Sequence, residues 1–358
     1  MNYLIGLRNS GHDVVYLEDC GMESWVYRCE TDNMTTELDY PASYVQDCLK
    51  PLGLGGEWIY RAGDRSEGMA LDRFLEVCSK ASLFIVHSNP INPWRPEYSW
   101  PKRRIFIDGD PGFTQIMLIQ GKPDLTDTID RCERLFTVGQ LLTKPGSQIP
   151  SAGRRWFPTV HPVSLRDWHF AENGPATHFT SLMHWRGFHD LTHNGITYGQ
   201  KDREFPRFIE LPRFTTQPFL MGLTGASPEW MANHGWEVVS GVLVSRTPSS
   251  YQRFIQTSRA EFGVAKQGYV QTRGGWFSDR SACYLASGRP VLLQDTGQKE
   301  WVPVGEGILT FQDPPQALEG IRAINLDYER HRRAARLLAE EYFDVDRVLP
   351  PLLENAMN

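Results

Sequence analysis

The hydrophobic positions in the first half of the chain come in short runs that alternate with segments of helical periodicity. Residues 1–8 carry apolar side chains at helical spacing and end in a helix stop, Asn9 to Gly11. The next segment, 12–18, predicts a short buried strand. An amphipathic helix is expected over 71–80, and buried strands are expected over 82–87, 103–108 and 134–139. Short apolar strands separated by helices indicate a parallel sheet covered on both faces.

A second series of the same kind follows a polar, turn-rich stretch at 171–175. Its expected strands are 179–183, 237–239, 260–265, 290–294 and 307–311, and its expected helices are 251–258, 279–286 and 314–342. Residues 205–211 fit either a helix or a strand. Because 358 residues exceed what one hydrophobic core usually serves, two domains are expected. We therefore predict an α/β protein with Rossmann-like domains at 1–172 and 173–345, followed by a C-terminal tail at 346–358.

The order of elements at the start of the chain is unusual. A helix followed by the strand in "GHDVVYLED" is what one expects just after the first strand of a Rossmann-like domain. We therefore expect the first strand and its loop to be missing from the first domain. Of two explanations, we favour a protein start assigned downstream of the true one over a domain that naturally lacks its first strand.

Composition and charge limit the partners and the compartment. The formal net charge is -6 and no long basic run is present, which makes nucleic acid a poor partner without excluding it. The six cysteines form no C-x-x-C pair, as expected for buried thiols in a reducing cytosol. No apolar run approaches the roughly 18 residues of a membrane span, and the first residues lack a signal-peptide pattern. The expectation is a cytoplasmic protein without a transmembrane segment.

Candidate chemistry is concentrated between residues 274 and 297. Gly274 and Gly275 allow the backbone to approach a ligand closely. Ser278 and Asp279 are good helix N-caps, and Arg280 falls in the first turn of the predicted helix. A helix N-terminus exposes free N–H groups and positive potential, so it favours phosphate, and Arg280 would add a bidentate donor.

The ordered motifs of this region resemble the donor-binding half of GT-B glycosyltransferases. In that family a Gly-rich loop is followed by a helix ending A-x-G-x-P-V, a strand, and D-x-G. Here these motifs fall at 286–291 and 295–297, and a later E…G-x-G-x-L stretch fits Glu300 and 305–309. The resemblance is clear over about residues 255 to 345. It extends weakly into the first half of the chain.

The resemblance implies a hexosyltransferase-type enzyme that works in the cleft between its domains. The N-terminal domain would present an acceptor, which could be a small molecule, a glycan or a polymer. The C-terminal domain would hold a nucleotide-diphosphate sugar, as a substrate and not as a tightly bound cofactor. The implied donor-binding residues are Lys201, Lys266, Gly274, Gly275, Ser278, Asp279, Arg280, Ser281, Asp295, Thr296, Gly297 and Glu300.

One departure from the family bears on catalysis. Many retaining members carry two glutamates eight positions apart, and this chain has Gly275 and Cys283 there. An arginine such as Arg280 is closer to the spore-coat-maturation branch. The stereochemical outcome is therefore open, and a catalytically inactive binding or structural protein is the alternative. A nicotinamide-dependent oxidoreductase fits poorly, because no G-x-G-x-x-G follows a predicted strand.

Polar residues at predicted strand ends complete the set of candidates. Strand ends line the ligand crevice of parallel sheets, so His87, Asp108 and Asp110 are candidate catalytic bases. Asp108 and Asp110 have a structural alternative, since "DGDPG" is also a good turn. Lys201 and Lys266 follow strands in the same way, and surface lysines are their alternative.

Four histidines crowd one region of the sequence: His178, His184, His189 and His193. His189 and His193 would share a face only on a helix, which the flanking glycines do not support. We therefore expect no metal site.

Overall fold

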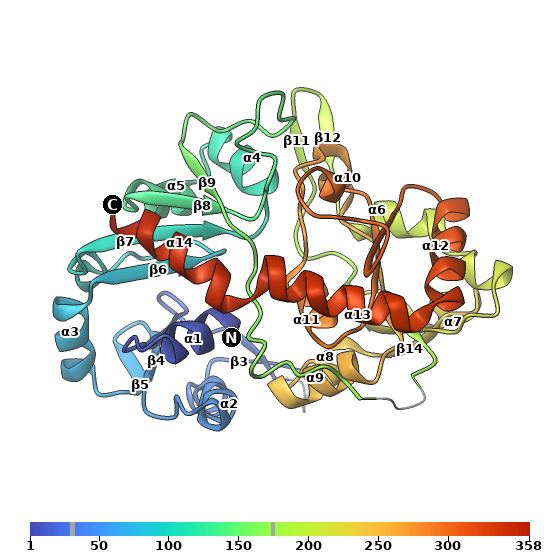
Figure 1. Cartoon of the computed structure of the whole chain (residues 1–358). Coiled ribbons are helices and arrows are strands. Elements are labelled where there is room, and N and C mark those ends of the chain that lie inside the picture. The colour runs from blue at the N-terminus through green and yellow to red at the C-terminus, as the bar shows by residue number, and fades with distance from the viewer. Residues whose placement is uncertain (29–32, 173–175) are drawn as a thin grey trace.

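The structure is a computed structural model that describes residues 1–28, 33–172 and 176–358. Two α/β halves lie side by side, the first drawn in blue to green and the second in yellow to orange, and the last helices run across both (Figure 1). The predicted linker at 171–175 falls mostly on residues 173–175, which lie outside the described residues. The boundary near this point therefore stays a prediction.

The described residues of the first half form three separate sheets, two of them with three or more strands. The larger one has four parallel strands in the order β6-β7-β8-β9. In the smaller one β1 pairs in parallel with β4, and β4 pairs in antiparallel with β5. The bounds are β1 Tyr16–Asp19, β4 Trp58–Ala62, β5 Arg65–Gly68, β6 Leu83–His87, β7 Arg103–Asp108, β8 Arg134–Thr137 and β9 Trp156–Pro158. The third sheet is the antiparallel pair of β2 Val26–Arg28 and β3 Asn33–Thr35.

The helices of the first half connect these strands. They are α1 Asn2–Asn9, α2 Asp39–Leu49, α3 Leu71–Lys80, α4 Phe113–Ile119 and α5 Pro123–Asp130, with 3-10 turns at Lys50–Leu52 and Pro96–Ser99. The order of α1 before β1 agrees with the expectation from the sequence. The large buried side chains Phe106 and Phe136 lie on adjacent strands and form part of the core.

The second half is built around one six-stranded parallel sheet in the order β14-β13-β10-β15-β16-β17. Counted along the chain this is 3-2-1-4-5-6, the order of doubly wound nucleotide-binding sheets. The bounds are β10 Phe179–His184, β13 Phe219–Thr224, β14 Glu237–Ser240, β15 Ala260–Gly263, β16 Val291–Gln294 and β17 Ile308–Phe311. A small hairpin of β11 Leu191–His193 and β12 Ile196–Tyr198 projects toward α4 of the first half.

Helices cover this sheet. They are α6 Lys201–Glu204, α7 Pro228–Ala232, α8 Gly241–Val244, α9 Pro248–Gln256, α10 Gln267–Thr272, α11 Asp279–Ala286, α12 Pro314–Leu326 and α13 Tyr328–Leu338. Residues 205–211, left open by the sequence, form mainly a 3-10 turn at Phe205–Phe208, and further turns lie at Leu211–Phe214 and Gln298–Glu300. Residues 189–193 are not helical.

The last helix returns to the first half of the molecule. A π-helical turn, Ala339–Phe343, leads into α14, Val345–Met357, which contains most of the predicted tail. Leu352 and Ala356 are buried there with Ile105 and Phe136. The returning segment also pairs with the outgoing one, since the Val163 amide donates to the Phe343 carbonyl at 2.7 Å. The two halves are thus joined by two adjacent chain crossings.

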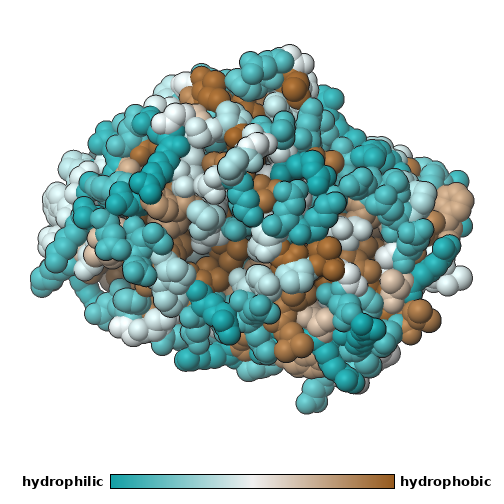
Figure 2. Space-filling model, turned by 45° about the horizontal axis from the view of Figure 1, so that its top comes forward, coloured by the Kyte–Doolittle hydropathy of each residue, from teal (hydrophilic) through white to brown (hydrophobic). Residues whose placement is uncertain are grey.

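No helix in the described ranges has the length and apolar character needed to cross a bilayer. Figure 2 shows mostly hydrophilic residues on one face, with hydrophobic residues gathered mainly near its middle.

Candidate functional site

An ion pair brings together two residues that the sequence selected separately. Asp110 follows the carboxyl end of β7 in the first half, and Lys266 precedes α10 in the second. Lys266 Nζ lies 2.5 Å from Asp110 Oδ1. The hydroxyl of Tyr269 donates to the same carboxylate oxygen. The strand ends of the two halves therefore face each other across a cleft.

Lys201 is the most unusual cation at this cleft. It begins α6, is only 8% exposed, and has no hydrogen-bond or ion-pair partner among the described residues. Burial, together with the charges of Arg280 and Lys266, lowers the pKa of Lys201 to about 7. Buried ammonium groups are normally paired, so this one indicates a place for an anion.

Gln200 adds a second unmatched donor next to Lys201. The residue is 1% exposed, and its amide nitrogen Nε2 has no partner in the part of the chain that the structure describes. The amide of Gln267 donates to the Gln200 carbonyl at 3.3 Å, which brings the start of α10 and Lys266 close. Gln200 is not among the residues predicted from the sequence, where its only signal is its place beside Lys201.

Arg280 lies in the first turn of α11, as predicted, but it is already paired. Its Nε donates to Oε1 of Glu261 at 2.6 Å, and its NH1 donates to the Leu182 carbonyl at 2.9 Å. Glu261 is fully buried on β15. Ser278 caps the helix by accepting the Arg280 amide at 3.2 Å. Arg280 therefore braces the sheet beneath the helix start while its charge still faces Lys201.

Asp279 and His161 approach each other from opposite halves. The Asp279 side chain is reachable by solvent but surrounded by protein, as in a cleft. Burial would raise the pKa of Asp279, but His161, Arg280 and hydrogen bonds at the helix start outweigh it and lower the pKa. Ser281, the next predicted residue after Arg280, is fully buried with an unpartnered hydroxyl among the described residues. His161 was not found from the sequence.

The predicted glycine loop packs against the first half of the molecule. The Leu141 amide donates to the Gly274 carbonyl at 3.0 Å, and a Cβ on Gly274 would lie 2.4 Å from Ile149 Cδ1. Gly275 and Gly297 have φ of +74° and +98°, and a Cβ on either would lie within 3 Å of Leu141. These glycines allow close protein packing between the halves, beside the proposed anion position.

The Asp295 turn supports this loop. Asp295 accepts the Gly297 amide at 2.8 Å and the side chain of Gln312 at 2.9 Å. Thr296 is buried, and its hydroxyl donates to the Trp276 carbonyl at 2.8 Å. Glu300 is exposed and lies 3.8 Å from Arg273. Asp295 and Thr296 hold the backbone of the turn, whereas Glu300 is accessible.

The three candidate bases lie in different surroundings. Asp108 is fully buried and accepts hydrogen bonds from the Asp110 amide and from the side chains of Thr114, Gln115 and Thr137. His87 is reachable by solvent, but the surrounding protein and His161 lower its pKa to about 4. His87 and Asp110 therefore reach the cleft, and Asp108 organises the loop that carries Asp110.

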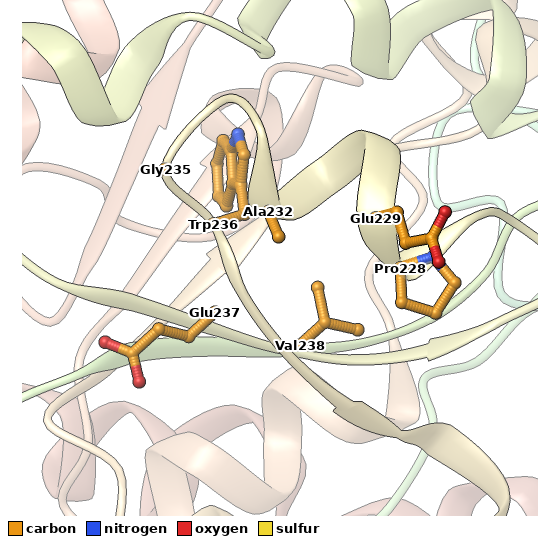
Figure 3. Close-up of a pocket in the computed structure, with 7 residues that line it drawn as sticks. All are labelled: Pro228, Glu229, Ala232, Gly235, Trp236, Glu237 and Val238. Carbon is orange, nitrogen blue, oxygen red and sulfur yellow. The ribbon is translucent and has the colours of Figure 1, made fainter.

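A separate hollow lies away from this cleft. It occupies about 650 Å³ beside the edge strand β14, between α7 and the strand. Figure 3 shows Trp236 and Val238 with Glu229 and Glu237 around it. None of the predicted site residues lines this hollow. Within the described residues, no group of three or more His, Cys, Asp or Glu side chains could hold a metal ion.

Comparison with known proteins gives a clear result for the fold. No family model and no curated protein matches the sequence. Solved structures do match. An α-glucosyltransferase with UDP and DNA containing an HMU base aligns at a TM-score of 0.59 and 11% identity, over 100% of this chain and 94% of the other. An α-glucosyltransferase with UDP-glucose and DNA containing an abasic site aligns at 0.56 and 11%, over 96% and 99%.

A third match comes from Anabaena. The HepE protein, in complex with UDP and glucose, aligns at a TM-score of 0.54 and 10% identity, over 96% of this chain and 99% of the other. These alignments run across both halves and their connection. The chain therefore has the GT-B fold, with two Rossmann-like domains, as the sequence resemblance predicted. At these identities the likeness defines the fold and leaves the activity to the site.

Proposed function

We propose that this protein is a glycosyltransferase that uses a nucleotide-diphosphate sugar as its donor. The observation that carries the proposal is the pair of unmatched buried donors, Lys201 and Gln200, beside Arg280 at the start of α11. A diphosphate supplies the negative charge and the acceptor oxygens that these groups lack. The similar structures that contain UDP or UDP-glucose support a uridine nucleotide as the first donor to test.

The proposed reaction takes place between the two halves. An acceptor hydroxyl forms a bond to the anomeric carbon of the sugar, the bond from that carbon to the phosphate oxygen breaks, and the nucleoside diphosphate leaves. The hydroxyl proton passes to a base, for which Asp110 and His87 are the candidates at the cleft. Lys201, Lys266 and Arg280 would stabilise the leaving diphosphate by charge.

We further propose a hexose as the transferred sugar and the cytoplasm as the site of action. The five described cysteines are free thiols, which supports a reducing compartment. Two of the similar structures contain DNA, so DNA belongs in the acceptor panel beside glycans and small molecules. The net charge of -6 favours the other acceptors.

Hydrolysis of UDP-hexoses, measured by UDP release, tests the proposal. We expect slow hydrolysis by the wild type, and its loss in Lys201→Ala. Leu326→Ala, a change at an exposed side chain far from the cleft, is the control and should keep the activity. UDP binding without hydrolysis or transfer would favour the inactive GT-B-fold protein, and failure to bind any nucleotide diphosphate would contradict both.

A further inference from the structure

The ion pair between the halves lies at the edge of the proposed donor site. Asp110 Oδ1 accepts from both Lys266 and Tyr269, so one carboxylate of the first half is held at the start of α10 in the second. Lys266 Nζ also lies 4.3 Å from the ring centroid of Phe188. Tyr269 is 2% exposed and stacks on Trp276 with ring centroids 4.3 Å apart. Aromatic rings therefore fix both partners of the carboxylate.

Lys266 is shared between this pair and the anion position. Its charge is one of the causes that lower the pKa of Lys201, so the two ammonium groups are electrostatic neighbours. One ammonium group cannot neutralise a carboxylate and a diphosphate at the same time. A diphosphate placed at Lys201 would also repel Asp110. Asp110 and a phosphate group would therefore each need the positive charge of Lys266.

We infer that Asp110 competes with the donor diphosphate for Lys266, and that Tyr269 is the positioning residue that keeps Asp110 in the cleft after the exchange. The inference rests on the proposed function for the identity of the donor, but it requires only a diphosphate group. Phosphate binding releases Asp110 from its cation, and the freed carboxylate can accept the proton of an acceptor hydroxyl. Donor binding thereby prepares the base for the acceptor.

Calorimetric titration with inorganic pyrophosphate and with UDP tests the exchange. We expect Asp110→Asn to bind both about threefold to tenfold more tightly, because Lys266 is then free for phosphate. Lys266→Gln should bind both more weakly. In the Lys266→Gln background, Asp110→Asn should no longer tighten binding. Asp47→Asn removes an exposed carboxylate from α2 of the same half and should leave both affinities unchanged.

Each outcome decides the inference. Unchanged or weaker binding in Asp110→Asn overturns it, and tightening that persists in Lys266→Gln shows repulsion without competition and also overturns it. The expected pattern with pyrophosphate but no binding of UDP would keep the inference and contradict the proposed donor. If the wild type binds neither probe, the inference fails, and a uridine nucleotide as the donor fails with it. Asp110→Ser replaces Asp110→Asn if thermal melting shows that the asparagine variant does not fold.

Tyr269→Phe separates positioning from folding. The change removes only the hydroxyl that donates to Asp110. We expect the kcat for UDP-hexose hydrolysis to fall about tenfold or more, with the KM for the UDP-hexose nearly unchanged. A fall in thermal stability with kcat unchanged would show a structural role only and would overturn the assignment of Tyr269.

Discussion

Lys201 sets the electrostatics of the proposed donor site. Buried and without a partner in the described part of the chain, it has a pKa of about 7, far below that of an ordinary lysine. The cause is burial, reinforced by Arg280 and Lys266. An anion bound beside it would stabilise the charged form, so ligand affinity and proton uptake are linked.

This linkage predicts the pH dependence of UDP binding. Below pH 7 Lys201 is protonated before and after binding, so affinity should not depend on this group. Above pH 7 the free protein must take up a proton, so affinity should fall by up to tenfold per pH unit until the pKa of the complex is reached. Calorimetry at pH 8 in buffers of different ionisation enthalpy should show uptake of about one proton.

Lys201→Arg is the matched control, since a guanidinium stays charged throughout this range. Its UDP affinity should be nearly independent of pH between 7 and 9, with no proton uptake. If UDP affinity depended on pH equally in the wild type and in Lys201→Arg, the pH dependence could not be assigned to Lys201.

For Arg280 the prediction concerns stability, because this residue is paired with the fully buried Glu261. Arg280→Ala leaves that carboxylate without a counter-charge, so we expect the free energy of unfolding to fall by about 3–5 kcal/mol. Adding Glu261→Gln should recover part of the loss. Urea unfolding of both variants provides the measurement, and a loss below about 1 kcal/mol would show that the pair does not brace the sheet.

The candidate site could be predicted only in part at this scale. Lys266, His87 and Asp110 follow from the rule that the ends of parallel strands line the crevice. Lys201 does not, because it follows β12 of the antiparallel hairpin. The partner of Arg280 does not, because Glu261 reaches it only through the packing of α11 on β15. Glu261 lies 19 positions before Arg280 on a different element, so the spacing along the chain does not indicate the pair.

At the level of elements, two helices were predicted with their exact bounds. The predicted helices at 71–80 and 279–286 match α3 and α11 residue for residue. β13 was missed, although it pairs with β10 along its whole length. Its sequence contains Gly222, which lowers strand propensity, and a Cβ there would lie 2.4 Å from Leu182 Cδ2. The glycine is needed for packing between neighbouring strands, which a single segment does not reveal.

Gly288, just after the end of α11, is expected to contribute to stability through its backbone conformation and its packing. Gly288 has φ of +65°, and a Cβ there would lie 2.2 Å from the ring of Phe170. Gly288→Ala should lower the free energy of unfolding by about 1–2 kcal/mol from backbone strain alone, and by more through Phe170. Gly121→Ala has a similar φ of +69° with open space around it, so it measures the backbone cost alone. Equal losses in both variants, measured by urea unfolding, would show that Phe170 moves aside freely.

At the scale of the whole molecule, two crossings connect the halves, and the second carries α14 back onto the first sheet. We propose the domain boundary at 171–176, as the sequence predicts. A protease cut there would leave α14 attached to the second half but packed against the first. The two fragments should therefore co-elute in gel filtration and separate only in denaturant. Separation under native conditions would show that α14 does not hold the halves together.

Thermal unfolding with UDP, compared between the wild type and Lys201→Ala, tests the central claim most directly. A ligand present at a hundredfold excess over its Kd stabilises the folded protein by about 2.7 kcal/mol, so the wild-type Tm should rise by several degrees. The variant should fold but show little or no rise. A wild-type Tm that does not change with uridine, guanosine, adenosine or thymidine diphosphate at millimolar concentration would contradict the nucleotide-diphosphate site.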